Sequence, residues 1–467
     1  MPEGKMEKIV SWAKRRGFIF PSSEIYGGVA GVYDFGPRGV ELINNLKQLW
    51  WKRFVTDRDD VVGIDSAILM SRRVWQASGH EKGFSDPLVE CKKCHARFRQ
   101  DRIENPKSKI QPVSPQARRG GNPKQIQNSK SQIQNKCPEC GGELTEAKQF
   151  NLMLKTYLGP VEEEKNLTYL RPETAQGMFV NFKNVLDTSR QKLPFGIAQI
   201  GKSFRNEITT GEYLFRVREF EIAEIEYFVQ PGNDEKWFDY WLGEWKKFLL
   251  DLDISEKNLI EYQHSKKDLS HYSKRTVDYN FRFPFGEKEL TGVANRTDFD
   301  LKNHEEFSGQ DLKYFDEASG KKYWPYVIEP TLGIGRLALA AICDAFEEIS
   351  GGRSGAEGAG EEEVVMHFAP KIAPVKVAVL PLVKKLSEPA KKIYLDLKKC
   401  YVSEFDESGT IGRRYRRQDE IGTPYCITFD FDSLKDKKVT VRDRDSMKQD
   451  RVEIDKLSQF LWGKLGK

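Results

Sequence analysis

The sequence has no long apolar run, and this absence excludes one class of protein. No stretch of the 467 residues approaches the roughly 18 consecutive apolar residues that a membrane-spanning helix needs. The first residues, MPEGKMEKIVSWAKRRGF, are amphipathic without a long apolar core, so we expect neither a cleaved signal peptide nor a membrane partner. Net charge is also small: +5, against 75 basic and 70 acidic residues, is weak support for an anionic partner.

Cysteine is scarce as well, with seven residues, and its spacing is informative. Four cysteines form the pairs CKKC and CPEC, a pattern that suits a reducing cytoplasm better than a disulfide scaffold. Two such pairs offer four thiolates to a tetrahedral structural Zn²⁺, and free thiols are the alternative. The predicted ligands are Cys91, Cys94, Cys137 and Cys140. We expect the other three, Cys343, Cys400 and Cys426, to lie in the core because each sits in an apolar run.

Composition divides the chain into four stretches: 1–90, a cysteine-framed insert at 91–140, 141–370 and 371–467. The insert contains the degenerate repeat NPKSKIQ, NPKQIQ and NSKSQIQ within 101–136. Few large apolar residues occur there, which favours a disordered insertion over the other possibility, a basic RNA-binding arm. A Gly-rich surface loop is expected at 351–363.

The last stretch, 371–467, alternates strand and helix patterns. VKVAVLPLV, YCITFDFD and KVTVRDRD are typical of strands, and EPAKKIYLDLKK is typical of a helix. This alternation predicts a separate α/β unit with a mixed or partly parallel sheet. Within it, GRRYRRQ places four arginines around Tyr415, which indicates either an RNA-binding surface or a solvated basic loop.

The densest chemistry lies in GKSFRNEITTGEYLFRVREFEIAEIEYF (201–228). If 215–228 is one strand, alternate residues share a face and present two arginines, an aromatic ring and then carboxylates. That order suits a phosphate, a planar base and an ammonium group in turn. The face comprises Arg216, Arg218, Phe220, Ile222, Glu224 and Glu226. A solvated strand with many salt bridges is the alternative.

Two motifs carry a family resemblance. FRNE, followed by Arg216, Phe220 and Glu224, resembles the second signature motif of class II aminoacyl-tRNA synthetases, and EPTLGIGR (329–336) resembles the third. The resemblance implies an α+β fold: an antiparallel-sheet catalytic domain, a zinc-knuckle-like insert and a C-terminal α/β anticodon-binding domain. It implies Arg205 on the α-phosphate of ATP, Phe220 on adenine, Arg336 on the γ-phosphate and Glu289 near ATP and Mg²⁺. The full ATP set is Arg205, Asn206, Glu207, Phe215, Arg216, Val217, Arg218, Glu219, Phe220, Glu289, Leu290, Gly333, Ile334, Gly335 and Arg336.

Further stretches resemble glycyl-tRNA synthetases of the homodimeric single-chain type. GVYDFGPRGVELINNLKQLWWKRFV (31–55) is similar to the motif that builds their dimer interface; SGHEKGFSDPLVEC, RPETAQGMF, ANRTDFDL and IGRRYRRQDEIGTPYCITFDFD are similar to other glycyl signatures. Thr331 departs from the usual Ser, and Gln100 from the usual Ala. The resemblance implies catalysis by Arg205, Arg336 and Glu173, and a glycine site formed by Arg99, Glu173, Phe220, Glu221, Ile222, Ala223, Glu224, Arg296, Glu329, Pro330, Thr331, Leu332 and Gly333.

Glycine itself explains a site rich in carboxylates. Since it has no side chain, recognition must use its ammonium group, its carboxylate and close walls that exclude larger amino acids. The resemblance therefore implies ATP-dependent ligation of glycine to the 3′ end of tRNA(Gly), without an editing domain. Two alternatives remain: a catalytically inactive synthetase-like protein that binds nucleic acid, and a class II synthetase for another small amino acid.

Overall fold

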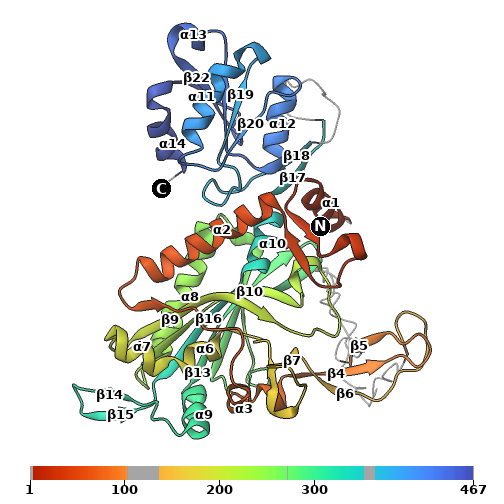
Figure 1. The fold of residues 1–467 in the computed structure, drawn as a ribbon, viewed down its shortest axis with the longest axis vertical. Coiled ribbons are helices and arrows are strands. Elements are labelled where there is room, and N and C mark those ends of the chain that lie inside the picture. The colour runs from red at the N-terminus through yellow and green to blue at the C-terminus, as the bar shows by residue number, and fades with distance from the viewer. Residues whose placement is uncertain (1–3, 101–102, 104–135, 271, 352–362, 466–467) are drawn as a thin grey trace, which may run out of the picture.

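The computed structural model describes residues 4–100, 103, 136–270, 272–351 and 363–465, and it divides into three parts (Figure 1). A large domain is built on one sheet, a small lobe projects from it, and the C-terminal unit lies at the opposite end. The predicted disordered repeat and nearly all of the predicted Gly-rich loop lie outside the described residues. None of the helices in the described part of the chain combines the length and apolar character that crossing a membrane requires.

The large domain is organised by a seven-stranded sheet with the order β11-β12-β13-β16-β10-β9-β3. All neighbours are antiparallel except β3 and β9, as expected for the class II catalytic domain. The strands are β3 (Val61–Gly63), β9 (Phe195–Phe204), β10 (Glu219–Val229), β11 (Leu259–Gln263), β12 (Arg275–Phe283), β13 (Gly286–Thr297) and β16 (Tyr326–Gly333).

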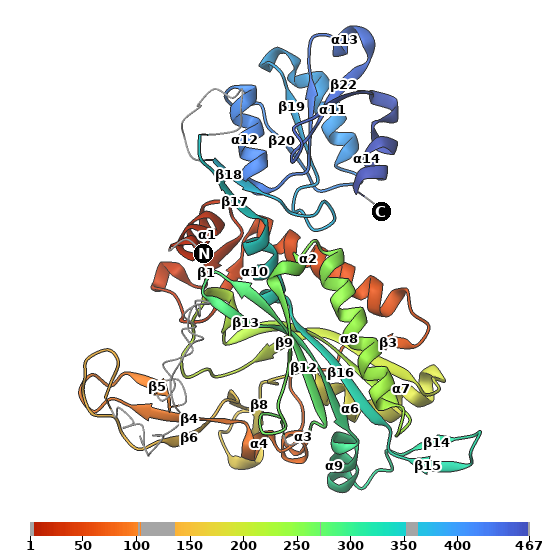
Figure 2. The same cartoon turned by 180° about the vertical axis from the view of Figure 1, so that it is seen from behind.

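The two faces of the sheet have different coverings (Figure 2). Odd-numbered residues of β10, including Ala223 and Ile225, belong to the main core with α2 (Pro37–Trp51), α8 (Asp234–Asp251) and α10 (Ile334–Ala345). On the even face, Phe228 packs with α6 (Ala175–Val180) and α7 (Phe182–Ser189). Of the remaining even residues, Glu226 is fully buried, whereas Phe220, Ile222 and Glu224 are available to form a site.

The predicted strand 215–228 begins later than expected. A 3₁₀ turn occupies Tyr213–Phe215 and β10 starts at Glu219, so Arg216 and Arg218 precede the strand. Positive φ angles at Glu212 and Tyr213 show the tight turn that separates the two segments. The alternation from Phe220 to Glu226 is as predicted, but the arginines reach their positions from a turn.

The small lobe contains the cysteine-framed insert. Its sheet has the order β5-β4-β6, from β4 (Ser85–Glu90), β5 (Arg97–Arg99) and β6 (Lys148–Asn151). The other elements of the large domain are short or peripheral: α1 (Lys5–Arg15), β1 (Ile19–Pro21), β2 (Tyr33–Phe35), α3 (Arg72–Ala77), α4 (His80–Gly83), β7 (Lys155–Tyr157), β8 (Leu167–Tyr169), α9 (Phe299–Ser308), β14 (Tyr314–Asp316), β15 (Lys321–Tyr323), β17 (Phe346–Ile349) and β18 (Glu363–Met366).

The C-terminal unit has a five-stranded sheet with the order β20-β19-β21-β22-β23, parallel for the first three strands and antiparallel for the rest. This confirms the predicted mixed sheet. Its elements are β19 (Val377–Pro381), α11 (Ser387–Leu397), β20 (Ser403–Phe405), α12 (Ile411–Ile421), β21 (Tyr425–Phe429), α13 (Ser433–Asp436), β22 (Lys438–Asp443), β23 (Gln449–Glu453) and α14 (Leu457–Leu465). Cys343 and Cys426 are buried as predicted; Cys400 is exposed in the turn after α11, so that prediction is wrong.

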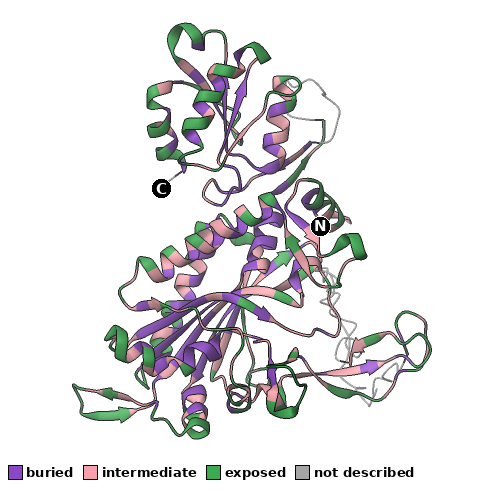
Figure 3. Ribbon diagram, in the orientation of Figure 1, coloured by how far each residue is buried: buried purple, intermediate pink, exposed green. Residues whose placement is uncertain are grey.

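The C-terminal unit has a core of its own, and its junction with the large domain is partly apolar, because Ile421 of α12 belongs to the main core, and partly polar. Val375 still belongs to the main core, whereas Val377 begins the C-terminal one. Across the junction, Arg38 pairs with Glu404 at 2.6 Å, and His367 lies 2.6 Å from Asp445. Figure 3 shows the strands buried in both parts, with exposed residues gathered on the outer helices and loops.

Candidate active site

A cavity of about 430 Å³ opens over the even face of β10. It brings together residues from β10, β13, β16, the start of α10 and the edge of the small lobe. The sequence-predicted residues that line it are Arg99, Glu173, Arg205, Glu207, Phe215, Arg216, Val217, Phe220, Glu221, Ile222, Glu224, Glu289, Leu290, Arg296, Glu329, Thr331, Leu332, Gly333, Gly335 and Arg336.

The structure places six predicted residues away from the lining. The backbone of Asn206 donates to the Leu152 carbonyl at 2.7 Å, Arg218 donates to the Ala30 and Glu207 carbonyls, and Glu219 pairs with Lys202. The other three, Ala223, Pro330 and Ile334, are buried. Glu221 lines the cavity, but its carboxylate pairs with Lys47 of α2 at 3.2 Å, so its charge is already matched within the protein and not reserved for glycine.

Sequence reasoning missed six residues of the lining: Phe84, Asp86, Leu152, Leu214, Tyr272 and Thr291. Phe84 and Asp86 lie inside the quoted stretch SGHEKGFSDPLVEC, so its individual residues could have suggested them. Asp86 pairs with the predicted Arg99 at 2.6 Å. Tyr272 lies in no recognised motif, and only the fold brings it to the site.

One end of the cavity is cationic, and we call Arg205, Arg216 and Arg336 the cationic end. The Arg205 guanidinium lies 5.3 Å from the Phe220 ring and 5.4 Å from the Phe84 ring, and its Nε donates to the Pro172 carbonyl at 3.2 Å. No other hydrogen bond from this guanidinium occurs among the described residues, so its terminal nitrogens can meet a ligand.

Arg336 is fixed by the start of α10, directly after β16 ends at Gly333. Its guanidinium lies 4.4 Å from the Phe215 ring, pairs with Glu289 at 3.1 Å and donates through Nε to the Phe215 carbonyl at 3.2 Å. Arg216 pairs with Glu207 at 3.3 Å. These contacts orient the arginines while a helix N-terminus adds a further preference for anions.

The other end is acidic, and we call Glu173, Glu224 and Glu329 the acidic end. Glu224 accepts hydrogen bonds from the Thr174 backbone at 2.9 Å, from the Thr174 hydroxyl and from the Thr331 hydroxyl at 3.0 Å. Burial and the nearby Glu173 raise its pKa against the effect of these donors. Burial raises the pKa of Glu329 to about 8, although Arg296 opposes the shift with a hydrogen bond of 2.8 Å.

Glu173 has the opposite behaviour. Burial disfavours its charge, but His80 at 3.2 Å, Arg296 and a hydrogen bond from Gln176 together lower its pKa below the ordinary range. It is therefore an ionised carboxylate in a buried setting. Arg296, itself buried, also binds Asp300 at 2.8 and 2.9 Å and lies 4.0 Å from the Tyr272 ring.

Glu226 differs sharply from Glu224, two residues away on the same face. It is fully buried, and among the described residues neither of its carboxyl oxygens has a hydrogen-bond partner. Burial and the nearby Glu329 raise its pKa well above the ordinary value. Burial therefore favours the neutral, protonated form of this carboxyl group.

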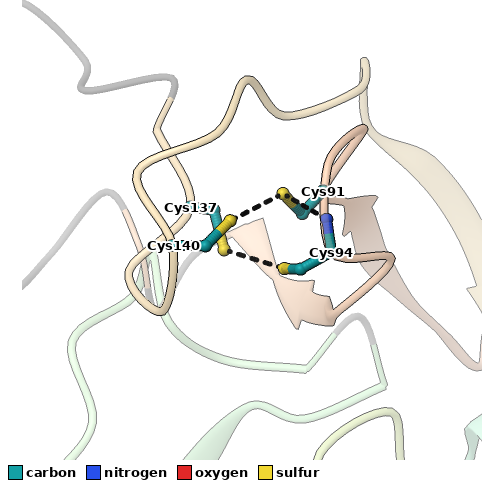
Figure 4. Close-up of side chains that lie close together, drawn as sticks. All are labelled: Cys91, Cys94, Cys137 and Cys140. Carbon is teal, nitrogen blue, oxygen red and sulfur yellow. Dashed lines mark hydrogen bonds between the residues drawn. The ribbon is translucent and has the colours of Figure 1, made fainter.

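The four cysteines of the two CxxC pairs meet in the small lobe (Figure 4). Their sulfurs all lie within 4.8 Å of one another, with Cys91 Sγ 3.5 Å from Cys140 Sγ and Cys94 Sγ 3.6 Å from Cys137 Sγ. A tetrahedral zinc site with Zn–S bonds of about 2.3 Å requires sulfurs about 3.8 Å apart. The donor set and its spacing therefore fit Zn²⁺.

The arginines of GRRYRRQ do not converge on an open surface. The segment is helix α12, where Arg414 is buried and donates to the backbone carbonyls of Pro381 and Gly409, and Tyr415 turns inward to Thr428. Arg417 pairs with Asp406 at 2.6 Å. The prediction that Tyr415 is a stacking ring is wrong because its side chain packs within the C-terminal unit. Arg413 alone of the four arginines is exposed.

Comparison with known proteins agrees with this geometry. The family model for the tRNA synthetase class II core domain (G, H, P, S and T) matches residues 157–346, and the model for the anticodon binding domain matches 376–463. Class II synthetases use ATP and Mg²⁺. A solved prolyl-tRNA synthetase from Cryptosporidium parvum, complexed with L-proline and AMP, shares the fold with a TM-score of 0.61 at 13% identity, over 99% of this chain and 79% of that one.

Curated relatives match at much higher identity. The glycine–tRNA ligase of Caldanaerobacter subterraneus subsp. tengcongensis is 54% identical over 463 residues, covering 98% of both chains. That of Clostridium acetobutylicum is 54% identical over 466 residues, covering 99% of both, and that of Thermobifida fusca is 51% identical, covering 98% of this chain and 97% of that one. With its class II core, its anticodon-binding domain and these relatives, the chain belongs to the glycine–tRNA ligase family of aminoacyl-tRNA synthetases.

Proposed function

We propose that the cavity over β10 activates glycine with ATP, and that the chain then transfers the glycyl group to the 3′ end of tRNA(Gly). The observation that carries this proposal is the polarity of one cavity, cationic at one end and acidic at the other. Triphosphate and ammonium groups have the complementary charges. A catalytically inactive synthetase-like protein that binds nucleic acid would have no need of this arrangement.

At the cationic end, Arg205 binds the α-phosphate, Phe220 stacks on adenine and Arg336 binds the γ-phosphate, with Arg216 beside the terminal phosphates or the base. Support comes from the available terminal nitrogens of Arg205 and from the position of Arg336 in the first turn of α10. Mg²⁺, when bound, neutralises phosphate charge, and Glu289 is the residue we propose to hold it. The remaining predicted ATP residues fall in three places. The segment between β9 and β10, continuing into the first residue of β10, supplies Asn206, Glu207, Phe215, Val217, Arg218 and Glu219. Strand β13 supplies Leu290, and the junction of β16 and α10 supplies Gly333, Ile334 and Gly335.

At the acidic end, Glu173, Glu224 and Glu329 surround the glycine ammonium, and Arg296 orients Glu329. Thr331 replaces the expected Ser, yet its hydroxyl donates to Glu224 at 3.0 Å, so the hydroxyl keeps a function. The glycine carboxylate is already ionised near neutral pH and attacks the α-phosphorus without a general base, forming glycyl-adenylate and releasing pyrophosphate. Positioning and charge stabilisation by Arg205 and Arg336 then supply the rate enhancement.

An ATP–pyrophosphate exchange assay over the amino acids tests this function. We expect exchange with glycine, and rejection of alanine and serine at the activation step because the walls are close. A chain that supports no exchange would be the catalytically inactive alternative. Comparable exchange with alanine or serine would instead favour a synthetase for another small amino acid.

We also propose a structural Zn²⁺ held by Cys91, Cys94, Cys137 and Cys140, in a lobe that contacts the acceptor end of the tRNA. Cys94→Ser and Cys137→Ser should lower metal content and charging. Replacing residues 103–134 by a short Gly/Ser linker should leave zinc content and charging nearly unchanged, since loop length costs only about 0.6 kcal/mol per doubling. Loss of charging with full zinc content would make the repeat an RNA-binding arm.

The remaining assignments concern assembly and location. We propose four segments, 1–90, 91–140, 141–370 and an anticodon-binding unit at 371–467, in a cytoplasmic homodimer. Support for the dimer comes from α2, whose outer side borders a shallow apolar hollow that includes Trp51 and Ile200. Sedimentation of the protein at micromolar concentration tests it, and a purely monomeric species would contradict the dimer.

A further inference from the structure

A chain of buried hydrogen bonds lies behind Glu173, on residues that do not line the cavity. Gln176 Nε2 donates to Glu173 Oε1 at 3.0 Å and to Asp300 Oδ1 at 3.1 Å, while Gln176 Oε1 lies 2.8 Å from His304 Nε2. Gln176 is fully buried, and Asp300 and His304 are 1% and 5% exposed. Solvent therefore does not reach the contacts of Gln176 with Asp300 and His304.

The chemistry of the neighbours fixes the orientation of the Gln176 amide. Its two amide hydrogens are both used by carboxylates, and a reversed amide would place Oε1 against two carboxylate oxygens. Oε1 must therefore accept a hydrogen bond, which requires His304 to carry its hydrogen on Nε2. Burial lowers the pKa of His304 to about 4, so the ring is neutral and this single tautomer satisfies the amide.

The second oxygen of Glu173 is held from the other side. His80 Nε2 lies 3.2 Å from Glu173 Oε2, and His80 Nδ1 lies 2.8 Å from the Ser78 hydroxyl. Because each oxygen has a partner, the carboxylate cannot rotate freely.

The same amide connects two walls of the cavity. Asp300, the second acceptor of Gln176, binds Arg296 through two hydrogen bonds, and Arg296 binds Glu329 at 2.8 Å. Glu173 and Glu329 are thus joined through Gln176, Asp300 and Arg296 by an unbroken series of buried contacts. Such a series fixes the separation of two carboxylates that line one cavity.

We propose that Gln176, with its amide oriented by His304, is a positioning residue that holds Glu173 against the glycine ammonium and helps the pocket to reject alanine. This inference rests on the proposed role of Glu173. If Glu173 could swing away, the ammonium would lose an oriented acceptor and the pocket would gain room for a methyl group.

Two sets of variants test the inference by exchange kinetics with glycine, alanine and ATP each varied. Gln176→Met keeps the length of the side chain but not its hydrogen bonds, and His304→Leu leaves Gln176 Oε1 without a donor. We expect KM for glycine to rise about ten- to a hundredfold, as for a lost hydrogen bond to a charged group. KM for ATP should stay unchanged, and the preference for glycine over alanine should fall.

His304→Gln is the matched rescue, because its amide can donate where His304 Nε2 donates. It should recover most of the glycine affinity and selectivity that His304→Leu loses. If Gln176→Met lowers the melting temperature and ATP binding, the comparison of His304→Leu with His304→Gln tests the inference instead. Unchanged glycine KM and selectivity in Gln176→Met, or equal losses in the two His304 variants, would overturn the inference.

Glu173→Gln distinguishes a failure of this inference from a failure of the proposed role of Glu173 in binding glycine. Normal glycine KM in that variant would remove Glu173 from the glycine site altogether. Weakened glycine binding in Glu173→Gln with normal Gln176 and His304 variants would leave the site intact and overturn only the positioning role.

Discussion

The cavity over β10 and helix α12 both come from strongly charged sequence, but the two regions use their charge differently. In the cavity, Arg205 keeps terminal nitrogens without a hydrogen-bonded partner among the described residues, and Glu224 faces the same space. In α12, Arg414 ends on backbone carbonyls and Arg417 on Asp406. The cavity leaves charged groups available to a ligand, whereas most charged groups of α12 are paired with other groups of the protein.

The two regions differ in whether their charged side chains point toward one common space. Strands alternate their faces, so Phe220, Ile222 and Glu224 of β10 point to one space, and β13 and β16 add charged groups to it. A helix distributes neighbouring residues around its axis, so the arginines of α12 meet four different surroundings. Density of charge in a sequence therefore indicates a ligand site only when the local structure directs the charges together.

The largest expected effect is the loss of Arg205. Arg205→Ala should lower glycine-dependent pyrophosphate exchange by about 10²–10³-fold, since it removes a preoriented stabiliser of transition-state charge. Arg413→Ala, the matched change on α12, should leave exchange unchanged because Arg413 is far along the chain in the other unit. Exchange rates and melting curves of both variants provide the measurement, and near-normal exchange by Arg205→Ala would refute the ATP assignment.

The next effect concerns stability in the second region. Asp419 of α12 binds Arg442 of β22 through two hydrogen bonds of 2.8 and 2.9 Å, with both side chains only 7% exposed. Asp419→Asn should cost about 3–5 kcal/mol of unfolding free energy, because it leaves a buried guanidinium without its charge partner. The Asp419→Asn variant should keep its ATP–pyrophosphate exchange activity at temperatures where its C-terminal unit is still folded. Urea unfolding that matches the wild type would show that the pair is dispensable.

Within the cavity, Glu224 and Glu226 allow a sharper comparison. Glu224→Gln should lower kcat/KM for glycine by about ten- to a hundredfold, because the carboxylate bound by Thr174 and Thr331 becomes neutral. Glu226→Gln should change it by less than about threefold, because Glu226 is already neutral and Gln has nearly the same shape. If Glu226→Gln were the more damaging variant, the neutral state of Glu226 would be wrong.

Glu226 also predicts a pH dependence of stability. Its pKa is raised in the folded protein relative to about 4.3 in the unfolded chain, so the folded state keeps a proton that the unfolded state loses. The stabilisation is complete below the unfolded pKa and falls by up to about 1.4 kcal/mol per pH unit above it, until the folded pKa is reached. Since Gln does not titrate, the stability of Glu226→Gln relative to the wild type should rise between pH 5 and 7. Parallel urea-unfolding curves would contradict this.

Several parts of the structure could be predicted because their sequence signals are local. The strand-like C-terminal runs and the paired cysteines each depend on short spacings, and the motifs around Arg205 and Arg336 contain most of the lining residues. The late start of β10, at Glu219 and not at 215, was missed because no local sequence signal marks the 3₁₀ turn at Tyr213–Phe215. Tyr272 and the links from Gln176 to Asp300 and His304 depend on long-range packing, which no spacing encodes.

The smallest expected effect concerns Arg413, the one exposed arginine among the four of α12 and therefore its remaining candidate for a contact with RNA. Among the described residues, Arg413 has no ion-pair partner, whereas Arg417 is paired with Asp406. If Arg413 contacts a phosphate of the tRNA, Arg413→Ala should weaken tRNA binding a few-fold and reduce the slope of log affinity against log salt by about 0.7–0.9. Arg417→Ala, the matched control, should leave that slope unchanged, because its charge is already neutralised within the protein. Binding titrations of tRNA(Gly) at several salt concentrations distinguish the two variants, and equal slopes would move the anticodon contact away from α12.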